Sequence, residues 1–152
     1  MTAIGMEQSR LLAIARWLFA GCGVWLIALG AYFAFLRPPL LPEDPRYMGA
    51  TLAQIQATLP GLAAWLGKVF TVMGGFMAAA GVLTLFAARQ LPAAAGARFT
   101  IAMAAAGAVG VGLMSAVNFV LASDFRWVLL APATAWLLAV VAAMRTTPPR
   151  VR

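Results

Sequence analysis

Residues 17–36 read WLFAGCGVWLIALGAYFAFL, a run of twenty residues without a charged side chain. The hydrocarbon core of a bilayer is about 30 Å thick, and an α-helix crosses it with roughly 20 apolar residues. This run therefore predicts a transmembrane helix. Three further uncharged runs, at 69–88, 99–123 and 127–144, predict three more.

The composition supports this interpretation. The chain has 152 residues, of which 64% are hydrophobic and 10% charged, whereas a soluble domain averages about 45–50% apolar and roughly 25% charged. A small domain buries only part of its surface, so a water-soluble fold cannot hide this apolar fraction. We therefore expect an all-α integral membrane protein, a bundle of four transmembrane helices in a single domain over 1–152. The soluble, disordered and nucleic-acid-binding classes are excluded.

The expected helices span about 10–36, 62–88, 98–122 and 125–144. They extend beyond the uncharged runs because Arg16 and Lys68 can snorkel from the terminal turns. Four spans place both termini on one side of the membrane, and that side then carries seven of the eleven basic residues. Because positive charge collects in the cytoplasm, we expect cytoplasmic termini. The seven are Arg10, Arg16, Arg89, Arg98, Arg145, Arg150 and Arg152.

The segment Phe19-Ala20-Gly21-Cys22 is similar to a lipoprotein processing site. Arg16 interrupts the apolar region that such a signal needs, and the apolar run continues past Cys22 to Leu36. We therefore expect an intact first helix, with cleavage as the alternative. Cys22 is then a small packing residue, and a single cysteine allows no intrachain disulfide.

The connection at 37–61 is expected to be an exofacial loop. The prolines of Arg37-Pro38-Pro39 end the first helix, and the stretch 42–45 (PEDP) is expected not to be helical. Residues 49–59 predict a short amphipathic helix with Leu52, Ile55 and Leu59 on one stripe. That helix lies on the membrane surface or caps the mouth of the bundle; the alternative is a plain surface helix packed on its own loop.

Charged residues of this loop and of the predicted turn near 123–126 face the same side of the membrane. They are open to two interpretations: a site for a cation or polar ligand, or ion pairs that pin the loop over the bundle at about 0–1 kcal/mol each. The absence of metal-ligand spacing favours the second. Asn118, the most polar residue deep in a span, is expected to hydrogen-bond another helix, or alternatively to orient a ligand. The candidate site residues are Glu43, Asp44, Arg46, Asn118, Asp124 and Arg126.

The third span is rich in small residues. Ala104, Ala108, Gly112 and Ala116 recur every four residues, and small side chains let helices approach closely in lipid. This spacing predicts that the third span lies at the centre of the bundle, and that Gly112→Leu disrupts its packing.

The sequence lacks several residue types on which catalysis and cofactor binding depend. There is no histidine, and the predicted spans carry no charged residue at mid-depth. Histidine-ligated haem, most zinc sites and proton relays need such residues. We therefore expect no cofactor, no metal and no catalysis by the chain's own side chains within the bilayer.

The stretch GGFMAAAGVLT at 74–84, followed by a short basic turn and a glycine- and alanine-rich span, resembles the DoxX-like group of small four-helix bacterial membrane proteins. The resemblance covers about 62–144. It implies a bacterial inner-membrane location and, more loosely, a membrane subunit associated with quinone-linked sulfur oxidoreductases. No catalytic residue is carried over from it.

Three functions are compatible with these observations. The leading expectation is a non-catalytic accessory or interaction component of a membrane complex, whose partners are the lipid bilayer and a second membrane protein or another copy of the chain. The alternatives are a DoxX-like subunit that binds a quinone or lipid within an oxidoreductase, and a small transporter or channel.

Overall fold

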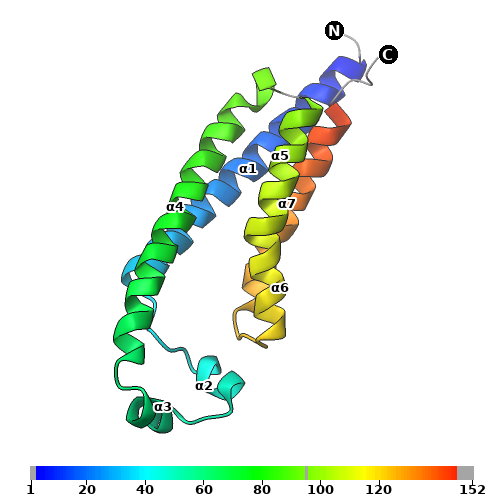
Figure 1. Cartoon of the computed structure of the whole chain (residues 1–152). Coiled ribbons are helices and arrows are strands. Elements are labelled where there is room, and N and C mark those ends of the chain that lie inside the picture. Colours follow the sequence, from blue (N-terminus) through cyan, green and yellow to red (C-terminus); the bar gives the residue numbers. More distant parts are fainter. Residues whose placement is uncertain (1–2, 95, 147–152) are drawn as a thin grey trace.

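The computed structural model describes residues 3–94 and 96–146, which form helices and, within these ranges, no strand. Four helical segments are long and apolar enough to cross a membrane, which confirms the predicted fold class at this level (Figure 1). The first two are α1 (Ala3–Phe35) and α4 (Leu62–Ala94). The third consists of α5 (Ala97–Gly107), the π-helical turn η1 (Ala108–Gly112) and α6 (Leu113–Val120), and the fourth is α7 (Arg126–Thr146).

Most predicted boundaries agree with these helices within two residues, but two do not. α1 begins at Ala3 rather than near residue 10, and α4 continues to Ala94 rather than ending near 88. The predictions followed the apolar runs, whereas backbone hydrogen bonds continue a helix wherever the local residues allow it. Pro92 lacks the N–H that would continue the hydrogen-bond ladder, and α4 extends only two residues beyond it.

α1 is one of the two inner helices of the bundle. It packs against α4 on one side and α7 on the other, and the third span packs mainly on α7. The order across the bundle is therefore α4, α1, α7 and the third span, so the predicted central position of the third span is wrong. The number of small residues in a helix does not predict this order, because small residues permit close packing but do not specify which helix is the neighbour.

α1 and α4 meet backbone to backbone at two glycine pairs. A Cβ added to Gly30 would lie 2.5 Å from the carbonyl oxygen of Gly74, and one added to Gly81 would lie 2.6 Å from that of Gly23. Only glycine fits at such distances, so these four residues set the separation of the two helices.

The third span is held to α7 by Trp136. The indole Nε1 of Trp136 donates a hydrogen bond to the carbonyl oxygen of Met103 at 2.8 Å, and a Cβ at Gly107 would overlap the indole ring. The π turn η1 begins at Ala108, directly after this contact. Trp136 also packs edge-to-face on Phe19 of α1, with ring centroids 5.4 Å apart.

The buried face of the third span is not the predicted stripe. A Cβ at Gly112 would contact only the Gly107 carbonyl of the same span, at 3.2 Å. Ala108 and Ala116 are exposed. The buried positions lie one residue earlier in the repeat: Thr100, Met103, Gly107, Val111 and Ser115. The four-residue spacing was predicted correctly, but the buried face is the adjacent one, which packs against Trp136.

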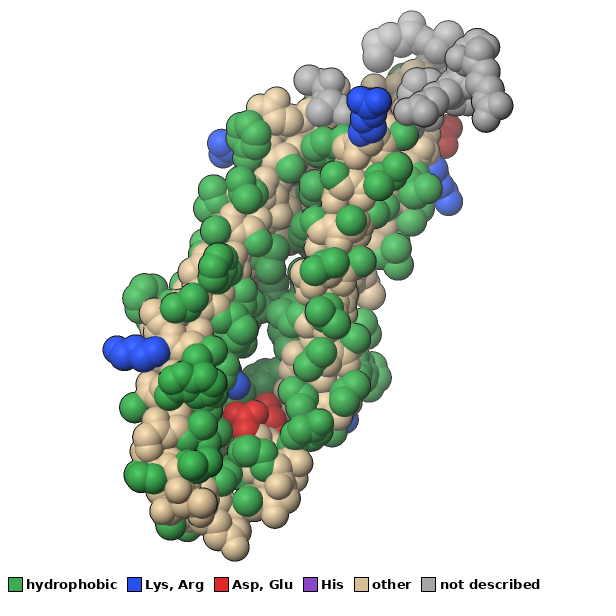
Figure 2. All heavy atoms as spheres, viewed as in Figure 1, with side chains coloured by type: hydrophobic (Ala, Val, Ile, Leu, Met, Phe, Trp, Pro, Cys, Tyr) green, Lys and Arg blue, Asp and Glu red, His purple; other side chains and the backbone are tan. Residues whose placement is uncertain are grey.

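The pair α1–α4 and the pair formed by α7 and the third span diverge toward one end of the bundle. We call this the loop end, since α2 (Glu43–Met48), α3 (Leu52–Thr58) and the turn at 121–125 lie there. α1 begins and α7 finishes at the opposite end (Figure 1). The space-filling view shows a hollow between α4 and the third span, with acidic side chains at its wider end, next to the loop (Figure 2).

The loop contains two short helices rather than one. Residues 42–45 were expected not to be helical, yet α2 begins at Glu43 and includes Pro45. A proline is tolerated in the first turn of a helix because the N–H it lacks there has no intrahelical acceptor. α2 ends at Met48 and is capped by Gly49, whose left-handed conformation (φ 67°) suits glycine.

α3 confirms a short helix within the predicted range 49–59. It starts later than predicted because Thr51 caps it, with a reciprocal capping box to Gln54. Ile55 is buried, whereas Leu52 and Leu59 are exposed.

Candidate functional site: a cavity at the loop end

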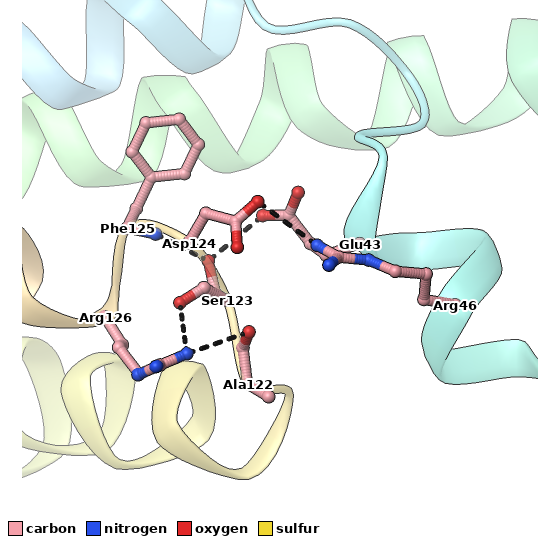
Figure 3. A network of polar contacts seen from close by, with 7 residues as sticks. All are labelled: Glu43, Arg46, Ala122, Ser123, Asp124, Phe125 and Arg126. Atoms are coloured by element: carbon pink, nitrogen blue, oxygen red, sulfur yellow. Dashed lines mark hydrogen bonds and ion pairs between the residues drawn. The ribbon is translucent and has the colours of Figure 1, made fainter.

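α2 docks across the wide end of the hollow onto the turn that precedes α7. The Ser123 hydroxyl donates a hydrogen bond to Oε1 of Glu43 at 3.0 Å. At the next residue of the turn, Oδ2 of Asp124 lies 3.1 Å from the guanidinium of Arg46 (Figure 3). These two contacts join residues about eighty positions apart in the chain. They bridge the two diverging helix pairs.

The two bridging contacts differ in environment. The side chains of Arg46 and Asp124 are 62% and 64% exposed, and an ion pair in water contributes about 0–1 kcal/mol. Glu43 is only 6% exposed and Ser123 only 3%. The predicted pinning of the loop by ion pairs is therefore supported at Arg46–Asp124, while the buried contact is a hydrogen bond that the sequence interpretation missed.

Arg37 is held in place by several partners at once. Its guanidinium donates hydrogen bonds to the carbonyl oxygens of Pro38 (2.9 Å) and Pro39 (3.5 Å). It forms an ion pair with Asp44 at 3.6 Å and lies 3.8 Å from the ring centroid of Phe70 on α4. The side chain is 9% exposed. Arg37 therefore ties the end of α1 to the loop and to α4, and has little capacity left for another ligand.

A cavity of about 250 Å³ lies between the loop and the helix ends. Its walls are mainly apolar, and they come from the loop, the first turns of α4 and the end of the third span. Arg37, Glu43 and Asp44 are the charged residues among them. The apolar walls include Leu40, Met48, Leu66, Phe70 and Leu121. A concave apolar site with a few polar groups is the usual form of a small-molecule site.

Glu43 is the charged wall residue with the fewest partners. Apart from the Ser123 hydroxyl, no hydrogen bond or ion pair reaches its carboxylate from residues 3–94 or 96–146. Asp44, in contrast, pairs with Arg37 and accepts a hydrogen bond from the Leu41 amide at 2.7 Å. Because Arg37 and Asp44 pair with one another, Glu43 is the acidic wall residue without a cationic partner among the described residues.

The remaining predicted site residues lie apart from the cavity walls. Arg126 donates to the carbonyl oxygens of Ala122 (3.1 Å) and Ser123 (3.2 Å), and no ion pair forms between Arg126 and any described acid. The Asn118 amide donates to the Met114 carbonyl of its own helix at 2.9 Å. The interhelical hydrogen bond predicted for Asn118 is therefore wrong, because a carbonyl one turn back satisfies the amide locally.

Several cavity residues were missed from the sequence. Tyr47, Phe70, Leu66 and Leu121 are ordinary apolar or aromatic residues, and only the fold brings them together. Arg37 carried a usable signal, since a cation directly after an aromatic-rich span favours contacts with rings.

Comparison with protein-family models, with curated proteins and with solved structures found no match to this chain.

Proposed function

We propose that this chain is a multi-pass membrane protein that binds an amphiphilic molecule in the cavity at the loop end, as a non-catalytic component of the membrane. The observation that carries the proposal is the cavity itself. It combines apolar walls with a buried carboxylate, and it lies at the wide end of a hollow between apolar helices. An alkyl chain can occupy the hollow while a polar head reaches Glu43.

The exposed surface of the bundle supports the membrane environment. Long apolar side chains such as Val72, Phe76 and Leu83 on α4 are more than half exposed. Exposing such residues to water is unfavourable, at about 25 cal/mol per Å², whereas lipid accommodates them. An amphiphile dissolved in the same lipid would reach the hollow laterally.

The test is native mass spectrometry of the protein released from mild detergent micelles. A retained amphiphile adduct is expected for the unmodified chain. Leu121→Trp places a bulky ring at the cavity wall and is expected to remove the adduct. Val120→Trp is the matched control, because Val120 is 73% exposed and is not a wall residue. An unmodified chain without any adduct, or a Leu121→Trp variant that retains it fully, would refute the proposal.

We further propose that the loop end faces away from the cytoplasm of a bacterial inner membrane. The basic residues at the end where α1 begins and α7 finishes support this orientation. In a Cys22→Ala background, Gln8→Cys should react with an impermeant maleimide only after the cells are opened, and Gln56→Cys should react in intact cells. The reverse result would overturn the orientation.

Association with a second membrane protein is compatible with amphiphile binding, and so is the DoxX-like role in a quinone-linked complex. A quinone ring is one of the apolar heads that the cavity walls would accept. The mass-spectrometry experiment separates these roles, because a protein partner, a quinone and a lipid differ in mass.

A further inference from the structure

We infer that the amphiphile recognised at the loop end carries an ammonium head, and that Glu43 is the residue that binds it. This inference rests on the proposed function, because it requires the cavity to hold an amphiphile. It names the chemistry of the head group, which the apolar walls alone do not determine.

The charge balance of the cavity favours a cation. Arg37 and Asp44 form an ion pair, and Arg37 also donates to two carbonyls. Only 6% of Glu43 is exposed, and among residues 3–94 and 96–146 the Ser123 hydroxyl is the one group that hydrogen-bonds to its carboxylate. A carboxylate removed from water is costly unless it is paired, and an ammonium group supplies both a positive charge and hydrogen-bond donors.

Other head groups fit less well. An anionic head would need a cation in the cavity wall, but Arg37 is engaged there. Arg46 contacts Asp124, Arg126 donates to two backbone carbonyls, and neither of the two is a wall residue. A metal ion would need several ligands, and the described residues contain no group of three or more metal-ligating side chains. A neutral head such as an alcohol could fit in the cavity but would leave Glu43 without a cationic partner.

The alkyl tail has a defined path. The walls next to Glu43 are apolar, and the hollow between α4 and the third span continues from the cavity along the bundle (Figure 2). A single-chain primary alkylammonium therefore matches both parts: the head at Glu43 and the tail among Phe70, Leu66 and Leu121.

The experiment is isothermal titration calorimetry on the full chain in phosphatidylcholine nanodiscs. Dodecylammonium is titrated first, then dodecanol and dodecyl phosphate, with partitioning into empty nanodiscs subtracted. Dodecylammonium is expected to bind most tightly. Glu43→Gln is expected to weaken dodecylammonium binding by roughly tenfold to a hundredfold, the usual range for a hydrogen bond to a charged group. The variant should leave dodecanol binding nearly unchanged.

Glu7→Gln is the matched control, because it makes the same substitution at an exposed carboxylate that lies at the opposite end and is not a wall residue. It should bind dodecylammonium as the unmodified chain does. Equal affinity of the unmodified chain for dodecylammonium and dodecanol would overturn the ammonium inference while leaving amphiphile binding intact. That comparison needs no variant, so it holds even if Glu43→Gln does not fold. If no probe binds the unmodified chain, both the inference and the proposed function fail.

Discussion

The close contact of α1 with α4 predicts a large difference between two adjacent substitutions. A Cβ at Gly74 would lie 2.7 Å from the amide nitrogen and 3.0 Å from the Cβ of Ala34. A Cβ at the next residue, Gly75, would meet no other described atom within 4 Å. Gly74→Ala and Gly75→Ala therefore add the same methyl group, with the same change in helix propensity, to two different surroundings.

The expected magnitude follows from these distances. Carbon atoms in contact prefer about 3.5–4.0 Å, so Gly74→Ala forces the two helices apart by about 1 Å. A gap of that size forfeits up to about half of each dispersion contact along the crossing, and overpacking of this kind costs about 1–3 kcal/mol. Gly75→Ala should be neutral or stabilising by up to about 1 kcal/mol, because alanine favours helix more than glycine does.

The assay is the free energy of unfolding in bicelles, measured by steric trapping or by titration with sodium dodecyl sulfate. Gly74→Ala is expected to be less stable than Gly75→Ala by at least about 1 kcal/mol. Gly30→Ala should behave like Gly74→Ala, because it faces the same crossing from the other helix. Equal stabilities of Gly74→Ala and Gly75→Ala would refute the backbone-to-backbone contact of α1 with α4.

Three further predictions test the packing of the helices. Gly112→Leu should lower the free energy of unfolding by less than about 0.5 kcal/mol, because a Cβ there meets no atom of another helix, and a large loss would show that the third span packs through the predicted stripe. Trp136→Phe should cost about 0.5–1.5 kcal/mol, because it removes the hydrogen bond to the Met103 carbonyl; an unchanged stability would mean that this bond contributes nothing. Cys22 is 3% exposed, so its thiol should react with a maleimide only after unfolding, and fast reaction of the folded protein would contradict the packing of α1 on α7.

The sequence by itself determined the number of long apolar helices and most of their boundaries. The reason is physical: a helix satisfies its own backbone hydrogen bonds, so a run of about 20 apolar residues is sufficient to predict one. The sequence also placed the charged residues Glu43, Arg46 and Asp124 at the same end of the bundle. The loop and the turn before the fourth helix are separated by two spans, so both lie at the same end.

Only the tertiary structure decided which helices are neighbours and which polar groups meet. Alanine and glycine occur on several faces of the third span, and the choice among those faces depended on Trp136, a residue of another helix. Likewise, nothing local distinguishes Glu43 from Asp44. Glu43 meets Ser123 and faces the cavity, while Asp44 pairs with Arg37, because α2 orients adjacent side chains in different directions. Contacts between distant segments depend on the relative placement of whole helices, which no short stretch of sequence encodes.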